Sequence, residues 1–181
     1  MFTREACTGG LFAVVTLLWA AAVAAQEGPG LGAPISAEDS APWDISIQPD
    51  GTGLPAGSGT AAAGAEIYAV KCIACHGERG AGQPNDQLVG GQGTLTELAQ
   101  VRTIGSFWPY ASTVFDYIRR AMPFQAPQSL TNDEVYALTA YLLALNGIID
   151  EDDAMNARTL ARVRMPNRDG FVLKYPEPVQ R

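Results

Sequence analysis

Histidine and cysteine are scarce in this chain of 181 residues, which contains one histidine and three cysteines. A structural zinc site uses four nitrogen or sulfur ligands. Only three such residues remain once Cys7 is lost with the amino-terminal segment described below. The same scarcity excludes an iron held by two histidines of this chain.

Basic residues are also few, because 12 lysines and arginines accompany 19 carboxylates and give a net charge of −7. An acidic chain is a poor ligand for nucleic acid, so no nucleic-acid partner is expected. The charge would suit a partner with a basic docking face, although ordinary solubility explains it equally well.

Long apolar runs are missing except near the amino terminus, where one covers residues 11–25. Arg4 precedes this run and small residues end it, which is typical of a secretory signal cleaved after Ala24 or Ala25. The run is shorter than the roughly 20 residues that span a bilayer. We expect residues 1–25 to be a signal peptide and the protein to be periplasmic, with a membrane anchor only if the signal stays uncleaved.

Against these absences stands one pentapeptide, Cys-Ile-Ala-Cys-His at residues 72–76, which has the C-x-x-C-H spacing of covalent haem attachment. On a helix, two sulfurs three positions apart lie on one face and can bond two vinyl groups, while His76 offers its imidazole to the iron. A disulfide would leave the histidine unexplained, and a thioredoxin-like pair needs a preceding strand. The motif predicts one covalent haem c bound by Cys72, Cys75 and His76.

A methionine is the next candidate ligand for the iron, because the only histidine is already used. Met122 is the best placed, since it ends a predicted helix and precedes Pro123. Met155 and Met165 follow the helix that should close the fold, and we expect Met165 to dock on the surface. A packing role for Met122 is the alternative. Thioether ligation would raise the potential and block the iron, which favours a one-electron carrier.

Other residues are candidates for the surroundings of the haem. A backbone carbonyl near Pro84 is expected to accept the Nδ1 proton of His76, with an irregular loop as the alternative. Trp108 or Tyr110 is expected to donate to a haem propionate, with an aromatic core as the alternative. Three arginines could neutralise propionates or simply be solvated: Arg102, Arg119 and Arg120.

The helical pattern predicts an all-α fold. The main helices are expected over residues 60–76, 113–121 and 132–146. Thr131 opens the last helix with a capping box, and Gly147 closes it. Gly64 would let the last helix approach the first closely. The capping pattern recurs at Thr94, where a shorter helical piece is expected.

The chain is predicted to consist of one helical domain with peripheral segments before and after it. The expected parts are the signal peptide 1–25, a Gly- and Pro-rich arm 26–59, a helical domain 60–147 and a tail 148–181. Within the arm, residues 43–48 alternate like a short strand that ends in a turn at residues 49–51. The arm is expected to lie against the domain or a partner, and a disordered arm is the alternative.

The order of elements resembles the class I cytochrome c family over residues 59–147: a C-x-x-C-H helix, a loop with Pro84 and Asn85, a methionine loop and a final helix. The local amino-acid sequence resembles the haem domain of the SoxD family, the cytochrome subunit of sulfane dehydrogenase in bacterial thiosulfate oxidation. The segments that carry this resemblance are residues 43–45, 103–112, 115–123, 128–131, 133–142 and 164–171. The resemblance implies a class I cytochrome c fold around one covalent haem.

The resemblance also implies roles and partners. It assigns Cys72 and Cys75 to thioether links, His76 to the proximal position and Met122 to the distal one. It implies a periplasmic molybdenum-containing dehydrogenase subunit as electron donor and a downstream cytochrome as acceptor. Fuller members carry a second haem domain, whereas this chain has a single C-x-x-C-H motif.

Other functions stay open at this point. A carrier could serve a different dehydrogenase, and a haem enzyme of the peroxidase-like or gas-binding kind would need a labile sixth ligand. A haem-bearing assembly module is the third possibility. The leading expectation is an electron-transfer subunit that is not itself the catalyst, with the arm and tail as docking elements.

Overall fold

The structure is a computed structural model that describes residues 31–172 and 174. The chain falls into two units, residues 1–44 and 45–181, which are described separately. In the described part of the first unit, α2 (Ala37–Ser40) begins with a capping box between Ser36 and Asp39. This short helix lies in an arm for which no helical pattern was expected, because a single turn is too short to show a period.

The segment of the arm at residues 43–48 differs from its prediction. Residues 43–48, all described, form no strand, and Ile47 instead packs against the core of the second unit. The turn predicted at residues 49–51 does form, with the Gln48 amide donating to the Thr52 carbonyl at 2.8 Å. An alternating pattern needs a partner strand to become a strand, whereas this segment is held by the apolar packing of Ile47 and by the Arg120 side chain, which donates to the Ile45 carbonyl.

The predicted helix over residues 60–76 is two helices, α3 (Ala61–Lys71) and α4 (Ile73–His76). The break falls at Cys72, whose φ of −125° is not helical. The amides of Cys75 and His76 both donate to the Cys72 carbonyl, so the helix restarts at once. The expectation of one continuous helix is wrong, although the motif still occupies a helical turn.

The two later helices agree with their local signals. α5 covers Ala111–Ala121, and α6 covers Asn132–Leu145. Thr131 and Glu134 form the predicted capping box at the start of α6. Gly147, with a φ of 65°, follows its end, in the left-handed region that glycine adopts readily.

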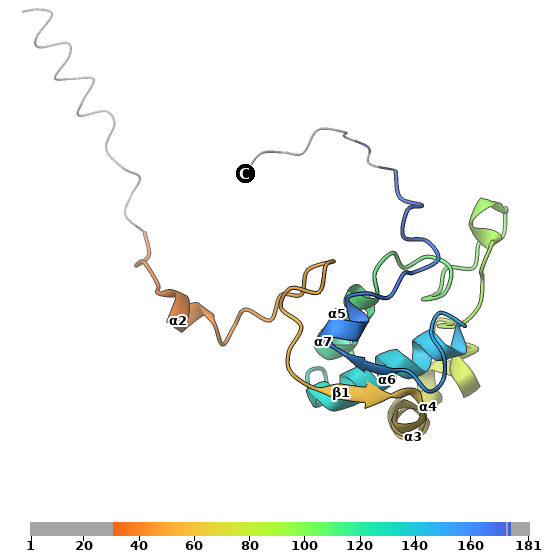
Figure 1. Ribbon diagram of the computed structural model, residues 1–181, viewed down its shortest axis with the longest axis horizontal. Helices are drawn as coiled ribbons and strands as arrows, with labels where there is room; N and C mark the ends of the chain where they lie inside the picture. Colours follow the sequence, from red (N-terminus) through yellow and green to blue (C-terminus); the bar gives the residue numbers. More distant parts are fainter. Residues whose placement is uncertain (1–30, 173, 175–181) are drawn as a thin grey trace, which may run out of the picture. The chain divides into compact units, whose positions relative to one another are not determined.

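α3 and α6 cross at close range, as predicted from Gly64. Figure 1 shows α3 nearly end-on below α6, which runs across the view. A Cβ added at Gly64 would collide with the Ala137 carbonyl oxygen of α6. Beside this contact, the rings of Tyr68 and Tyr141 lie 5.4 Å apart, so the helix pair is closed by aromatic packing.

The described fold is mainly helical, as predicted, with one small sheet that the all-α prediction did not include. β1 (Ser58–Thr60) pairs antiparallel with β2 (Ala154–Asn156), which leads into α7 (Ala157–Leu160). Gly59 lies opposite Met155, and a Cβ at Gly59 would collide with the Ala137 amide of α6. Strands of three residues carry too little alternation to be read from sequence.

The sheet joins the end of the arm to the tail, so the compact unit extends beyond residues 60 and 147. Leu160 and Met165 of the tail are buried in the core, each about 1 % exposed. Met155, Leu160 and Met165 therefore belong to the hydrophobic core, a position that their distance in sequence from the main helices concealed.

Two turns of 3₁₀-helix complete the described elements, η1 (Glu78–Gly80) and η2 (Thr94–Thr96). The piece expected at Thr94 is thus present but is one tight turn. Thr94 Oγ1 caps no helix; it donates to the Gly91 carbonyl and accepts from the Val101 amide. Among the helices of the described residues, none is long and apolar enough to cross a membrane. The predicted signal peptide lies outside the described residues.

Candidate functional site

A cavity of about 320 Å³ brings together most of the residues predicted to bind the cofactor. Cys72, Cys75, His76, Met122 and Trp108 all line it. The volume falls in the range of about 300–1,000 Å³ that is usual for cofactor sites. Much of the remaining wall is apolar and comes from α5, α6 and the loops beside them: Ile104, Val114, Ile118, Leu130, Leu138 and Leu142.

The imidazole of His76 is oriented by the loop that follows it. Its Nδ1 lies 2.9 Å from the backbone carbonyl of Asp86. That carbonyl can only accept, so the contact places the ring proton on Nδ1 and leaves the Nε2 lone pair free for a metal. The acceptor is two residues beyond Pro84, which does not line the cavity.

Backbone hydrogen bonds tie this loop to the motif itself. The Asn85 amide donates to the Cys75 carbonyl at 2.9 Å, and the Gly82 amide donates to the His76 carbonyl at 2.8 Å. Because both bonds return to the helical turn that carries the histidine, the Asp86 carbonyl and the imidazole share one rigid frame.

The two thiols of the motif lie at the same cavity and form no disulfide. Burial raises the pKa of the Cys72 thiol to about 11, and the neighbouring Lys71 opposes this shift only in part. The Cys72 thiol is therefore protonated at neutral pH and not poised as a thiolate nucleophile. The side-chain amide of Gln125 lies 3.9 Å from the sulfur of Cys75.

Met122 enters the cavity from the end of α5, where its amide donates to the Ile118 carbonyl at 3.1 Å. Its extended backbone (φ −119°, ψ 145°) ends the helix at this residue. Met155 and Met165 are buried in the core and do not line the cavity. We had expected Met165 to dock on the surface. It is buried instead, because the tail folds back over the core.

The two aromatic residues that were predicted together are separated. Trp108 lines the cavity, and its ring meets Tyr117 edge-on at 5.6 Å. Tyr110 does not line the cavity; it precedes α5, and the guanidinium of Arg168 lies 4.1 Å above its ring. Tyr110 is occupied by the tail instead of the cofactor site.

The three candidate arginines also differ in position. Arg102 lines the cavity, and its guanidinium lies 5.2 Å above the Phe107 ring. Arg120 is directed elsewhere, since it pairs with Asp116 at 2.7 Å and donates to the Ile45 carbonyl at 2.8 Å. Arg119, like Arg120, does not line the cavity.

Sequence reasoning missed Asn146, which connects the end of α6 to the loop that contains Leu88 and Gly90. Its side chain accepts from the Gly90 amide at 2.9 Å and donates to the carbonyls of Leu142 and Leu88. It is 8 % exposed, so these contacts satisfy a buried amide. The Asn-Gly pair was a visible signal, but it indicated only a helix end.

Tyr68 was also missed, although it lines the cavity beside the motif. Its hydroxyl donates to the Gly77 carbonyl at 3.0 Å and so fixes the residue after His76. Burial, with a smaller contribution from the nearby Cys72, raises the pKa of Tyr68 to about 12. The hydroxyl therefore stays protonated and continues to donate at any ordinary pH.

These donors suit a covalently bound haem. An imidazole nitrogen, a thioether sulfur and two thiols three residues apart converge on one largely apolar cavity. Axial histidine and methionine with two cysteine links is a combination that haem iron uses in proteins. The residues present therefore fit the cofactor that the motif predicts.

Comparisons with known proteins agree with this assignment. The model of the family described as "Cytochrome C oxidase, cbb3-type, subunit III" matches residues 59–142. A chain of the crystal structure of the sulfane dehydrogenase SoxCD from Paracoccus pantotrophus is 43% identical, with a TM-score of 0.75. The match covers 82% of this chain and 72% of that chain. No curated protein sequence matches.

Proposed function

Because the chain belongs to the class I cytochrome c family, close to its SoxD members, we propose that it carries single electrons from a sulfur-oxidising dehydrogenase subunit to an acceptor cytochrome. Covalent haem c is the cofactor of this family, and one C-x-x-C-H motif provides for one haem. The observation that carries the proposal is the convergence of this motif and Met122 on one cavity.

The proposed donor is a molybdenum-containing subunit. The support is the 43% identity to a chain of a sulfane dehydrogenase over 82% of this chain. Such a subunit would oxidise a sulfur compound by two electrons and release them one at a time to this protein. Sulfane sulfur is the proposed substrate, and sulfite is the alternative.

The ligand roles are part of the proposal. Cys72 and Cys75 would form the two thioether links, and His76 and Met122 would be the axial ligands. When bound, the haem supplies a one-electron redox centre. The Asp86 carbonyl would hold the Nδ1 proton of His76 at 2.9 Å, which keeps the ring correctly turned, directs Nε2 to the iron and makes the imidazole a stronger donor.

The walls of the cavity favour transfer of electrons over binding of small molecules. A thioether sulfur at Met122 would occupy the position that oxygen, peroxide or carbon monoxide needs. Apolar side chains from α5 and α6 form much of the wall, so less solvent would need to reorganise there when the charge of the iron changes. Iron ligands that do not exchange and an apolar cavity wall are properties of an electron carrier.

The proposed location is the periplasm. The support is the signal-like segment at residues 1–25 and the requirement of covalent haem attachment for export. Amino-terminal sequencing of the secreted protein tests the predicted cleavage after Ala24 or Ala25.

Co-purification tests the donor. The tagged full chain, expressed in its native host, is expected to bring down a subunit that contains molybdenum by metal analysis. Addition of a sulfane substrate to this complex should reduce the haem within one turnover, whereas sulfite alone should reduce it only if sulfite is the substrate. Reduction by neither compound would overturn the assignment to sulfur oxidation.

Carbon monoxide separates the carrier from the haem enzyme. The reduced protein is expected to bind carbon monoxide slowly and incompletely at neutral pH, because the Met122 sulfur must first leave. Rapid and complete binding would contradict a fixed sixth ligand and favour a gas-binding or peroxidase-like function.

A further inference from the structure

The aromatic segment at residues 107–110 has two different surroundings. Trp108 lines the cavity, whereas Phe107 and Tyr110, on either side of it, do not. Both of these outer residues are instead in contact with the tail of the chain. The tail therefore contacts the segment on both sides of Trp108, the residue of this segment that lines the cavity.

Three tail residues make these contacts, and we refer to Asn167, Arg168 and Phe171 as the tail clasp. The side-chain amide of Asn167 donates to the Phe107 carbonyl at 2.8 Å. The Phe171 ring meets the Phe107 ring edge-on with centroids 5.3 Å apart. The Arg168 guanidinium lies 4.1 Å above the centre of the Tyr110 ring.

The clasp is anchored and has a defined shape. Met165, two residues before Asn167, is about 1 % exposed in the core. The Gly170 amide donates to the Asn167 carbonyl at 3.2 Å, and a Cβ at Gly170 would collide with the Asn167 side chain. This turn places Phe171 beside Phe107 while Asn167 reaches the Phe107 backbone.

The contacts continue from the clasp to a charge at the cavity. Phe107 meets Phe171 and also lies under the guanidinium of Arg102, at 5.2 Å. Arg102 itself lines the cavity, with a further hydrogen bond at 2.9 Å to the Gln100 side chain. A cation held above an aromatic ring keeps its place better than a freely solvated one.

We propose that the tail clasp positions Arg102 and Trp108 at the haem cavity, and so sets the potential of the cofactor without touching it. Asn167 and Phe171 are positioning residues that act through Phe107. The inference rests on the covalent haem of the proposed function, and it is independent of which dehydrogenase supplies the electrons.

The sign of the effect follows from charge. Reduction removes one positive charge from the iron, so a nearby guanidinium favours the reduced state and raises the potential. Releasing Phe107 from the clasp frees Arg102 to move into solvent, where water screens its charge. Loss of the clasp should therefore lower the potential.

The test is redox titration of the purified holoprotein carrying Phe171→Ala or Asn167→Ala. We expect each variant to shift the ratio of reduced to oxidised haem at least threefold toward oxidised at a fixed potential, which is about 28 mV at 59 mV per tenfold change. The Soret circular dichroism should change in parallel, because Trp108 lies at the cavity. Phe171→Tyr keeps the ring and should retain the wild-type potential.

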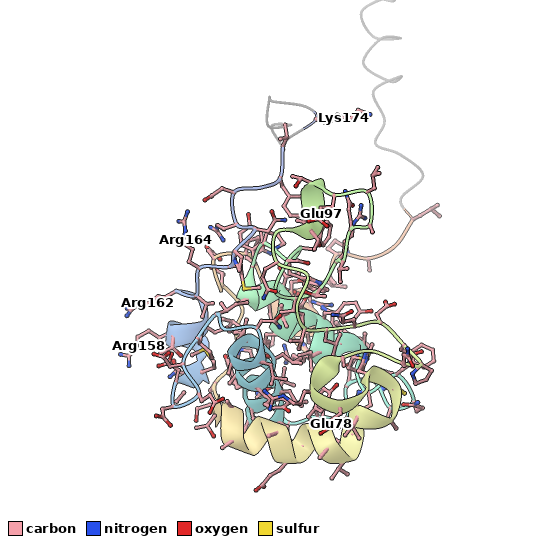
Figure 2. All side chains as sticks on the ribbon, turned by 90° about the vertical axis from the view of Figure 1, so that its right-hand side faces the viewer. Glu78, Glu97, Arg158, Arg162, Arg164 and Lys174 are labelled. Atoms are coloured by element: carbon pink, nitrogen blue, oxygen red, sulfur yellow. The ribbon has the colours of Figure 1, made fainter. Side chains whose placement is uncertain are left out.

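The control is Arg162→Ala, which removes a tail charge without entering the clasp. Figure 2 shows Arg162 pointing away from the domain, like Arg158 and Arg164. A double-mutant cycle with Arg102→Gln then tests the route. Phe171→Ala should shift the potential by less than half as much in the Arg102→Gln background, because the charge that it positions is already gone.

Two results would overturn the inference. One is a clasp variant with the same potential and Soret spectrum as Arg162→Ala. The other is full additivity of Phe171→Ala with Arg102→Gln. A pyridine haemochrome assay on the same preparations keeps the two proposals distinct: absence of haem c would refute the proposed function, whereas normal haem with unshifted potentials would refute the clasp alone.

Discussion

Two methionine-proline dipeptides of this chain have opposite surroundings. Met122 precedes Pro123 at the end of α5 and lines the cavity. Met165 precedes Pro166 in the tail and is buried in the core, about 1 % exposed. The same sulfur side chain is available as a ligand in one place and fills space in the other, because the fold and not the dipeptide decides what it meets.

The contrast extends to the two sides of the domain. On the cavity side, changes should act mainly on the iron. On the tail side, where β2 and α7 cover the core, changes should alter stability and leave the iron unchanged. The clasp is the proposed exception, since it belongs to the tail yet acts on the cavity.

The largest expected effect tests the cavity side. Met122→Leu keeps the volume but removes the donor sulfur, so the potential should fall by on the order of 0.1 V or more, within the roughly 0.8 V range that axial ligands cover. Carbon monoxide should then bind rapidly to the reduced protein. Met165→Leu, the matched control, should shift neither quantity; equal shifts in the two variants would erase the contrast.

The next effect tests the tail side. Met165→Ala should lower the free energy of unfolding by about 2–5 kcal/mol, since it leaves a cavity in the core, whereas Met165→Leu should cost less than about 1.5 kcal/mol. Urea titration of the oxidised holoprotein gives both values. If Met165→Ala shifted the potential while stability stayed the same, Met165 would belong to the cofactor site after all.

Two buried tyrosines, one at the cavity and one outside it, allow a further comparison at alkaline pH. Burial raises the pKa of Tyr68, at the cavity, and of Tyr136, outside it, to about 12 each. Because an unfolded tyrosine ionises near pH 10, stability is fully present below pH 10 and is lost as the pH rises toward 12, on the order of 2 kcal/mol for each residue.

Phenylalanine substitutions separate the two tyrosines. Tyr136→Phe and Tyr68→Phe should each flatten the loss of stability between pH 10 and 12, measured by urea titration across that interval. Only Tyr68→Phe should alter the haem spectrum, because its hydroxyl donates to the Gly77 carbonyl next to His76. The Tyr136 hydroxyl donates to the Pro55 carbonyl at 2.8 Å, so its loss should leave the spectrum unchanged.

Local signals explain what the sequence could predict. The C-x-x-C-H motif, the capping box at Thr131 and Glu134 and the close approach at Gly64 each depend on residues a few positions apart or on a missing side chain. The motif and the capping box are fixed by hydrogen bonding and geometry within one element, and the missing side chain of Gly64 marks where another helix can approach.

Long-range pairing explains what could not be predicted. The burial of Met165 and the β1–β2 sheet depend on a tail that folds back over distant helices. Tyr110, which we had predicted to lie with Trp108 at the cofactor, meets Arg168 of the same tail. No periodicity within these short segments reports their partners, because the contacts lie outside each segment.

The smallest expected effect comes from an ion pair beside the cavity. Lys71 Nζ lies 2.8 Å from Glu134 Oε1 and joins the end of α3 to the start of α6, with both side chains partly exposed. The hydrogen bond from Lys71, followed by that from the Thr131 amide, lowers the pKa of Glu134 below its ordinary value. This stabilisation is present above the ordinary glutamate pKa and is lost as the pH falls through the lowered value.

The variant Lys71→Gln should therefore cost less than about 1 kcal/mol at neutral pH, since water screens a partly exposed pair. Glu134→Gln should cost somewhat more, because it also weakens the capping box with Thr131. Urea titrations of the wild type and both variants at neutral and acidic pH measure each loss of unfolding free energy. Both losses should shrink as Glu134 becomes protonated. A change of potential in Lys71→Gln comparable to that of Arg102→Gln would show instead that the lysine, which also lines the cavity, acts on the iron.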